Sequence, residues 1–281
     1  MNLLIAGGDS RIGYMAEKLA AAGYTVFAHG VSSDRIPKKS IEEGAKEADA
    51  VILGMPVSKD GKTLFAPFSE TEISLRTLLP LLKKETPVLC GMASEEVRHV
   101  FSEAGISLRD YFAREDTALL NAVPTAEGAI EIAMRRLPVT LRGTKCLVTG
   151  YGRIGKYLAG ILAALGARVT VSARKESDFA LCRMAGVESV HTEKLDTAVR
   201  ECRVIFNTIP SPVLTDAVLS KLRPDCLIID LASLPGGIDA ESADARKIEY
   251  ERALSLPGKV APETAGEILC GAVQSILRER N

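Results

Sequence analysis

Short apolar runs alternate with amphipathic stretches along this chain, and most runs end at glycine, proline or a group of polar residues. Such runs are typical of buried strands, whereas apolar residues spaced by three and four are typical of helices. In the first half, the runs predict strands at residues 3–6, 25–28, 50–55, 87–91 and 107–112. Strands that alternate with helices indicate a parallel sheet.

A second series of the same kind begins near Val139 and predicts strands at residues 146–149, 168–173, 204–208 and 227–230. We therefore predict an α/β fold of two parallel-sheet domains with a cleft between them. A flavodoxin-like domain would occupy residues 1–138, and a Rossmann-like domain residues 139–261. A final helix, from about Pro262 to Arg278, has the length to return, so we expect residues 262–281 to pack on the first domain.

The strongest local motif joins the first strand of the second domain to an apolar helix. Gly150, Gly152 and Gly155 have the G-x-G-x-x-G spacing. In this context Gly150 permits a tight turn, Gly152 lets the backbone approach a pyrophosphate, and Gly155 lets the helix pack on the strand. The helix start would face the phosphates with free N–H groups, so we predict dinucleotide contacts here, including Arg153 and Ile154. The alternative is a close strand–helix turn without a ligand.

The strand at 168–173 ends at Arg174 and Lys175, where an NAD-preferring site would carry Asp or Glu. Arg174 offers a planar fork suited to the 2′-phosphate of NADP, and Lys175 and Ser172 lie beside it in sequence. We therefore predict NADP as the cofactor. NAD stays the alternative if the two cations are only solvated.

Two more turns follow the predicted strands 204–208 and 227–230. Ligands of open parallel sheets bind at the carboxyl ends of the strands, so the nicotinamide and its ribose would lie at these turns. The expected cofactor contacts are Thr208, Ile209, Pro210, Ala232 and Ser233.

Substrate contacts are expected from the first domain. Arg11 follows a glycine pair at the start of a predicted helix, where it could contact an anion, although a tight turn in a flavodoxin-like domain is the simpler interpretation. Ser58 and Lys59 follow the strand at 50–55, and at its carboxyl end they could hold a carboxylate. An exposed lysine in a loop can equally be solvated.

A predicted helix at residues 126–137 begins after Thr125, which is well placed as its N-cap. This helix would link the two domains, so polar residues near its start would face the cleft. Arg114, Asp116, Asn121 and Thr125 are therefore candidates for substrate contact. The alternative is that Arg114 and Asp116 form an ordinary surface salt bridge and that Thr125 is only a cap.

The composition is that of an ordinary globular protein, with 281 residues, 47% of them hydrophobic, and a formal net charge of −1. No long basic run is present, which argues against a role on nucleic acids or membrane surfaces. No apolar stretch approaches membrane-spanning length and the N-terminus lacks signal-peptide features, so we expect a cytoplasmic protein. The six cysteines form no C-x-x-C pair and the three histidines lie far apart, so no metal site is expected.

Motifs spread over nearly the whole chain carry a resemblance to a known family. They are Gly-Gly-Asp-x-Arg at 7–11, Pro-Val-Ser at 56–58, Asn-x-x-Pro-Thr-x-Glu-Gly at 121–128, the glycine fingerprint at 150–155, Asn-Thr-Ile-Pro-Ser at 207–211, Asp-Leu-Ala-Ser-x-Pro-Gly-Gly at 230–237 and Val-Ala-Pro-x-Thr-Ala-Gly at 260–266. On these motifs the chain resembles the dipicolinate synthase A-subunit family. The resemblance implies oxidation of dihydrodipicolinate to dipicolinate with NADP or NAD, a separate flavoprotein-like B-subunit of the synthase as partner, and action in the mother cell during sporulation.

Oxidation of a dihydropyridine transfers a hydride to the nicotinamide and releases a proton, and the aromaticity gained favours the step. The enzyme mainly has to orient two carboxylates against the cofactor ring. Asp116 or Glu127 is the candidate to accept the proton. Two other interpretations stay open, namely a two-domain hydroxy-acid dehydrogenase and a non-catalytic NADP-binding scaffold or sensor. The sequence also leaves open whether copies of the chain form a homo-oligomer.

Overall fold

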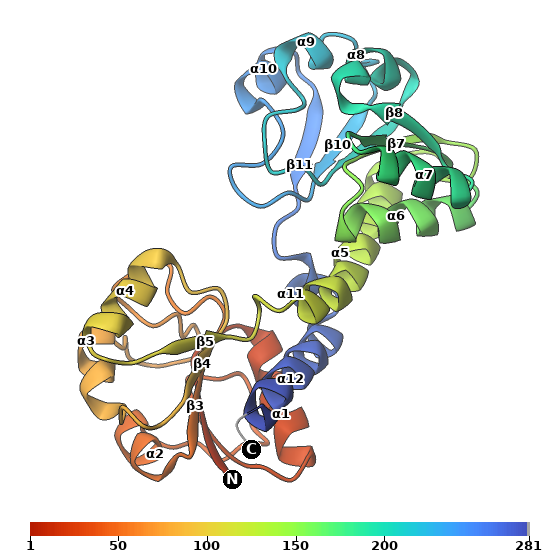
Figure 1. Cartoon of the computed structure of the whole chain (residues 1–281). Coiled ribbons are helices and arrows are strands. Elements are labelled where there is room, and N and C mark those ends of the chain that lie inside the picture. The colour runs from red at the N-terminus through yellow and green to blue at the C-terminus, as the bar shows by residue number, and fades with distance from the viewer. Residues whose placement is uncertain (280–281) are drawn as a thin grey trace. The chain divides into compact units, whose positions relative to one another are not determined.

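The chain packs as two compact units in the computed structural model, which describes residues 1–279 (Figure 1). Unit 1 consists of Met1–Asn121 together with the segment from Ala261 onward, and unit 2 consists of Ala122–Val260. The boundaries between the two units therefore lie between residues 121 and 122 and between residues 260 and 261. The sequence predicts domain boundaries between residues 138 and 139 and between residues 261 and 262. Unit 1 is discontinuous, because its last helix is separated from the rest of the unit by all of unit 2.

Unit 1 is built on a parallel sheet. Within residues 1–279, five strands form this sheet in the order β2-β1-β3-β4-β5. This is the flavodoxin-like order, and it confirms that part of the predicted fold class. The strands are β1 (Asn2–Ala6), β2 (Thr25–His29), β3 (Ala50–Leu53), β4 (Val88–Cys90) and β5 (Leu108–Asp110).

Successive residues of these strands enter two different cores, because side chains alternate between the faces of a sheet. Leu3 and Ile5 of β1 pack with helices α1 and α12, whereas Leu4 packs with α2, α3 and α4. The helices are α1 (Ser10–Ala21), α2 (Ile41–Glu47), α3 (Leu75–Leu78) with the 3-10 turn η1 (Leu79–Leu81), α4 (Glu95–Glu103) and α12 (Pro262–Arg278).

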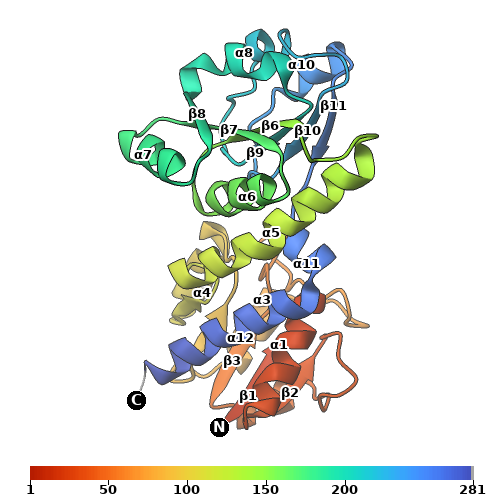
Figure 2. The same ribbon diagram turned by 90° about the vertical axis from the view of Figure 1, so that its right-hand side faces the viewer.

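Helices α12 and α1 lie side by side in both views (Figures 1 and 2). Gly266 makes the close approach possible, since a Cβ there would lie 2.6 Å from the carbonyl oxygen of Arg11. Lys18 of α1 lies 3.4 Å from Glu263 and 3.5 Å from Glu267 of α12. The last helix thus completes the core of unit 1 on one face of its sheet.

Unit 2 is built on a second parallel sheet. Among the described residues its strand order is β11-β10-β9-β6-β7-β8, which is the Rossmann order and confirms the second half of the predicted fold class. The strands are β6 (Lys145–Thr149), β7 (Arg168–Ala173), β8 (Glu188–His191), β9 (Val204–Asn207), β10 (Leu227–Asp230) and β11 (Glu249–Arg252). The helices are α6 (Arg153–Ala164), α7 (Glu176–Met184), α8 (Leu195–Ala198), α9 (Asp216–Leu219), α10 (Ala240–Ala245) and α11 (Leu256–Val260), with 3-10 turns η2 (Thr192–Lys194) and η3 (Val199–Glu201).

Helix α5 (Glu115–Arg136) corrects one prediction. The helix begins at Glu115 rather than at Ala126, and it contains Pro124 in its interior. Thr125 is therefore not an N-cap but an interior helical residue that is 7% exposed. The physical reason is that Glu115 and Asp116 complement the positive helix end and start the helix earlier, before the local cap signal at Thr125.

Candidate functional site

The glycine fingerprint forms the turn between β6 and α6. Gly150 has a φ of +89°, a left-handed conformation that favours glycine. A Cβ at Gly155 would collide with the carbonyl oxygen of Gly150, so only glycine lets α6 pack this close to the turn. Gly150 and Gly155 are therefore required by backbone geometry alone, as the predicted tight turn and close helix packing imply.

The third glycine serves a different purpose. Gly152 is the N-cap of α6 and makes no side-chain capping bond, and a Cβ built on it would meet nothing within 4 Å. This open space lies at a helix N-terminus, where backbone N–H groups and the helix dipole favour an anion such as a pyrophosphate. Arg153 is exposed at the first helical position, and Ile154 packs partly against the core.

A row of polar side chains crosses the carboxyl edge of the unit 2 sheet. The register places Ser172, Thr149, Asn207 and Asp230 beside one another on four adjacent strands. All four are 1% exposed or less. Thr149 donates its hydroxyl hydrogen to Asn207 Oδ1, and Asn207 Nδ2 donates to Asp230 Oδ1 at 2.7 Å. Because buried polar groups are costly unless bonded, this chain of bonds specifies the arrangement of the sheet edge.

The same side chains shape the two turns that follow β9 and β10. Asn207 Nδ2 donates to the carbonyl of Ile209 at 3.0 Å, and Asn207 Oδ1 accepts from the Ile209 N–H at 3.2 Å. Asp230 accepts backbone N–H bonds from Ala232 at 3.2 Å and from Gly237 at 3.0 Å. The predicted nicotinamide turns are thus held by buried side chains at the strand ends.

The predicted cofactor residues in these turns differ in exposure. Thr208 donates its hydroxyl hydrogen to the carbonyl of Thr149 at 2.8 Å, which ties the turn after β9 to β6. Pro210 and Ser233 are exposed, whereas Ala232 is buried. Thr208 therefore has a structural bond of its own, and the exposed positions are the ones accessible to a ligand.

Sequence reasoning missed Thr149, Asn207 and Asp230 as a unit. A signal was present, because each of the three apolar strands ends on a polar residue, in the segments Cys-Leu-Val-Thr, Val-Ile-Phe-Asn and Leu-Ile-Ile-Asp. A polar residue at the end of an apolar run resembles the first residue of a loop. Only the strand register distinguishes a buried network from three separate loop residues.

Arg174 and Lys175 follow β7 and are both exposed. Neither side chain makes a hydrogen bond or ion pair with a residue within 1–279; only the Lys175 backbone carbonyl accepts bonds, from the N–H groups that open α7. Ser172, which we expected beside them, is fully buried, and its hydroxyl has no partner among the described residues. The two cations are therefore available to an anion at the surface, while Ser172 lies in the interior of the sheet.

In unit 1, the turn after β1 leads into α1. Asp9 caps this helix by accepting the Arg11 N–H at 3.1 Å, and its carboxylate also accepts from the Arg11 guanidinium at 2.5 to 3.0 Å. Arg11 is 5% exposed. The side chain that we expected to contact an anion is paired with the capping carboxylate.

The segment at 58–63 is organised by one carboxylate. Asp60 accepts from the Ser58 hydroxyl at 2.9 Å and from the backbone N–H groups of Lys62 and Thr63 at 2.9 and 2.8 Å. These bonds hold the pKa of Asp60 well below its usual range. Lys59 is exposed, with Nζ 4.0 Å from the ring centroid of Phe65, so Ser58 and Lys59 both have local partners.

Arg114 forms ion pairs within unit 1. Its Nε lies 3.1 Å from Asp116 and its Nη1 lies 2.8 Å from Glu279, as in the salt-bridge alternative. Bonding to Arg114 and to the Thr117 N–H lowers the pKa of Asp116, which weakens this carboxylate as a proton acceptor. Glu127 is exposed on α5, where Asn121 is half-buried.

No group of three or more His, Cys, Asp or Glu residues within 1–279 could hold a metal ion. All six cysteines are buried free thiols, and burial raises the pKa of Cys146 to about 12 and that of Cys202 to about 11, so both stay protonated. No helix in the described part of the chain is long and apolar enough to cross a membrane.

Two family models match the chain, one in each half. Residues 2–112 match the N-terminal domain of the dipicolinate synthase A-subunit. Residues 122–233 match the NAD-binding domain of D-isomer specific 2-hydroxyacid dehydrogenases. Unit 2 is therefore a nicotinamide-cofactor domain of the dehydrogenase type.

Full-length relatives agree with these matches. The chain is 32% identical to the dipicolinate synthase A-subunit of Bacillus subtilis (strain 168), over 99% of this chain and 96% of the relative. The crystal structure of the dipicolinate synthase A-subunit from Bacillus halodurans superposes with a TM-score of 0.91 at 31% identity, covering 98% of this chain and 97% of that one. The A chain of the Bacillus subtilis enzyme superposes with a TM-score of 0.90 at 32% identity, covering 99% and 96%. The chain belongs to the dipicolinate synthase A-subunit family.

Proposed function

We propose that the chain is the subunit that oxidises dihydrodipicolinate to dipicolinate (pyridine-2,6-dicarboxylate), with transfer of a hydride to NADP. The observation that carries the proposal is the open dinucleotide turn at Gly152, in a chain of the dipicolinate synthase A-subunit family. A Rossmann turn alone supports only cofactor binding. The family membership supports the reaction.

The proposed reaction is a two-electron oxidation. One ring C–H bond of the dihydropyridine breaks and its electron pair leaves as hydride, while a second ring hydrogen leaves as a proton. The turn at Gly150, Gly152 and Gly155 would hold NADP, whose nicotinamide ring would supply the acceptor for this hydride. The pyridine product is aromatic, so the step needs mainly orientation of the substrate and a group that takes the proton.

Glu127 is our preferred proton acceptor. Asp116 is the alternative, but its ion pair with Arg114 lowers the pKa of Asp116 and makes it a weaker base. We propose that the two substrate carboxylates are bound by residues from the set of Arg11, Ser58, Lys59, Arg114, Asn121 and Thr125. Arg11 could take this role only by exchanging the Asp9 carboxylate for that of the substrate.

An assay of the purified chain tests the reaction directly. We expect NADPH absorbance to rise when dihydrodipicolinate and NADP are supplied. Since the Bacillus subtilis relative is named as one component of a synthase with more than one kind of chain, we propose a partner of the flavoprotein-like type, and the assay is run with and without it. Absence of NADPH formation under both conditions, together with measurable NADP binding, would favour the scaffold or sensor alternative.

The match of residues 122–233 to D-2-hydroxyacid dehydrogenases favours a second candidate function. Such an enzyme needs an arginine for the substrate carboxylate and a histidine paired with an acid for the alcohol. This chain has Ala232 and Ser233 after β10, and Glu263 and Thr264 at the start of α12, where we would expect those residues. The candidate predicts NADH or NADPH formation from small 2-hydroxy acids, which the same assay measures.

Substitution of Arg174 tests the cofactor preference. We expect Arg174→Asp to weaken NADP binding about tenfold or more, because a charge-assisted bond to the 2′-phosphate is replaced by repulsion. NAD binding should stay equal or improve. Arg183→Asp is the matched control, because Arg183 is also an exposed arginine but lies in the last turn of α7. Titration calorimetry with both cofactors gives the ratio of affinities, and an unchanged ratio in Arg174→Asp would contradict the proposal.

A further inference from the structure

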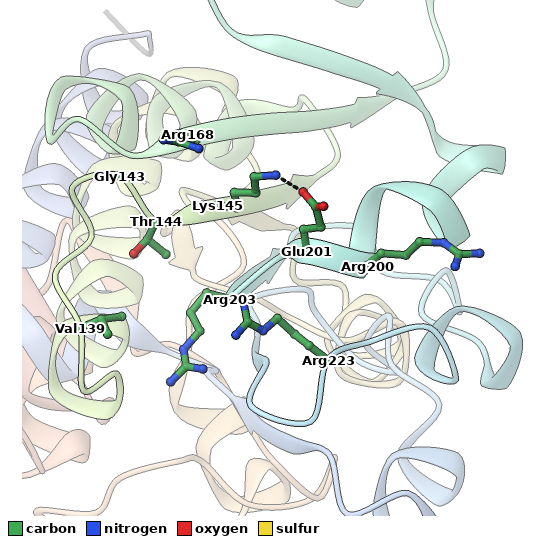
Figure 3. Close-up of a pocket in the computed structure, with 9 residues that line it drawn as sticks. All are labelled: Val139, Gly143, Thr144, Lys145, Arg168, Arg200, Glu201, Arg203 and Arg223. Carbon is green, nitrogen blue, oxygen red and sulfur yellow. Dashed lines mark hydrogen bonds and ion pairs between the residues drawn. The ribbon is translucent and has the colours of Figure 1, made fainter.

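A cavity of 740 Å³ lies at the amino edge of the unit 2 sheet. Its lining comes from segments at the starts of strands, with Lys145 opening β6, Arg168 opening β7 and Arg203 preceding β9 (Figure 3). All strands of this sheet run parallel, so the cavity is at the opposite edge from the Gly150 turn. The five residues of β6 separate the two edges by about 16 Å.

The cavity is strongly basic. Lys145, Arg168, Arg200, Arg203 and Arg223 line it, and Glu201 is the carboxylate among its lining residues. Lys145 is paired with Glu201, and a second carboxylate beside the cavity, Asp225, pairs with both Arg203 and Arg223. Arg200 extends away from the other side chains (Figure 3), so four cations against two carboxylates leave an excess of two positive charges in a protein whose overall charge is −1.

Two features show that the guanidinium N–H groups of this cavity are not all satisfied by the protein. The guanidinium of Arg168 makes no hydrogen bond or ion pair with another residue of 1–279, although its backbone N–H donates to the Thr144 carbonyl. Arg203 has a side chain only 17% exposed, and its buried Nε has no hydrogen-bond partner among the described residues. A buried guanidinium N–H without an acceptor is a common indication of an ion or water that completes the site.

The side chains come from several segments around one open cavity. Figure 3 shows Arg223 and Arg203 extending near each other from different segments, with Lys145 and Arg168 on the other strands, while the Arg200 side chain extends away from them. A second cavity, of 630 Å³, shares Lys145, Arg168, Arg200 and Glu201 with the first. The volume of the first cavity is that of a typical small-molecule site.

We propose that this pocket binds an anion that carries a chain of phosphoryl groups, at a site separate from the dinucleotide turn. Guanidinium groups bind phosphate oxygens through two parallel N–H bonds, and an excess of two positive charges suits the multiple negative charges of a diphosphate or triphosphate. A tricarboxylate has similar charge but a different spacing of its oxygens. The phosphate chain is common to inorganic polyphosphates and to nucleotides, and the experiment separates these sources.

Calorimetric titration of the full chain with sodium tripolyphosphate, in the presence of saturating NADP, tests the site. NADP occupies the Gly150 turn, so binding that remains comes from elsewhere. We expect saturable binding that weakens as the salt concentration rises, because exposed charges are screened. ATP that binds at least tenfold more tightly than tripolyphosphate would identify a nucleotide ligand, and equal affinity would identify the phosphate chain alone. Citrate that binds as tightly as tripolyphosphate would overturn the assignment to phosphate.

Arginine substitutions connect the binding to this pocket. We expect Arg168→Gln and Arg223→Gln each to weaken tripolyphosphate binding about tenfold. Arg183→Gln, at an exposed arginine on α7 that does not line the cavity, should leave it unchanged. NADP affinity and the melting temperature without ligand should stay at wild-type values in all three variants, which excludes misfolding. Wild-type tripolyphosphate affinity in the Arg168→Gln/Arg223→Gln double variant would overturn the proposal.

Discussion

Gly155→Ala is expected to abolish dinucleotide binding and to destabilise unit 2 by about 2 kcal/mol, as overpacking of a close contact does. The added Cβ would collide with the carbonyl oxygen of Gly150, which is a backbone atom and cannot rotate away. Helix α6 cannot retreat either, because Leu158 and Leu162 on its inner face are fully buried in the core. The measurements are NADP titration and thermal unfolding, where a fall of roughly 6 °C is expected.

The two neighbouring glycines provide matched controls on the same element. Gly160→Ala in α6 meets nothing within 4 Å, so it should keep NADP affinity and stabilise the helix by up to about 1 kcal/mol. Gly152→Ala also meets nothing in the protein, yet its methyl group would occupy the space proposed for the pyrophosphate. It should therefore weaken NADP binding while lowering the melting temperature less than Gly155→Ala does, since alanine replaces glycine only as an N-cap and meets no atom of the protein. If Gly152→Ala binds NADP as the wild type does, the dinucleotide is not bound at this turn as proposed.

Asn207→Ala is expected to lower the free energy of unfolding by about 3 kcal/mol, because it leaves buried polar groups without partners. Asp230 would lose its bond from Asn207 Nδ2, and the Thr149 hydroxyl would lose its acceptor. The backbone bonds to Ile209 would also be lost, so the turn after β9 should loosen and NADP affinity should fall. Urea denaturation and cofactor titration measure the two effects.

A double-mutant cycle separates the Asn207–Asp230 bond from general damage to the sheet. Asn207→Ala and Asp230→Ala each leave the other side chain buried without its partner, so the double variant should cost less than the two single costs added, by about 1.5 to 3 kcal/mol. Thr170→Val is the control, because Thr170 lies on β7 and donates to Glu188 at 3.3 Å at a half-buried position away from the row. It should change stability by less than about 0.5 kcal/mol. Additive costs in the cycle would mean that the bond does not couple the two strands.

The fold class could be predicted because its signals are local. Each buried strand is a short apolar run, and the fingerprint glycines meet steric requirements that involve only the turn and the helix after it. The last helix was expected from Pro262 to Arg278 and has those bounds, because proline at its first position and the apolar spacing mark it clearly. Helix α5 was predicted too short because Thr125 and Pro124 resemble a helix start, while the acidic residues that start it lie further upstream.

The parts of the site that sequence reasoning missed depend on strand order. Thr149, Asn207 and Asp230 become neighbours only because β6, β9 and β10 are adjacent in the sheet. The basic pocket has the same origin, because its arginines are scattered from 168 to 223 and each looks like an ordinary surface residue in the sequence. Hydrophobic periodicity predicts that strands exist, but it does not predict which strands are adjacent in the sheet, and therefore not which strand ends lie side by side. The burial of Ser172 was missed for the same reason. Arg174 lies only two residues further along the chain and is exposed, so sequence proximity did not show that Ser172 is buried.

The discontinuity of unit 1 has a consequence for synthesis on the ribosome. Helix α12 packs in one core with Ile12, Met15 and Leu19 of α1, but it is translated after the whole of unit 2. Domains generally fold as units during synthesis, starting with the one nearest the N-terminus. Here the order is reversed, since unit 2 is complete before unit 1 can bury that apolar surface. The nascent chain therefore carries an open hydrophobic face for most of its synthesis, a natural binding surface for chaperones.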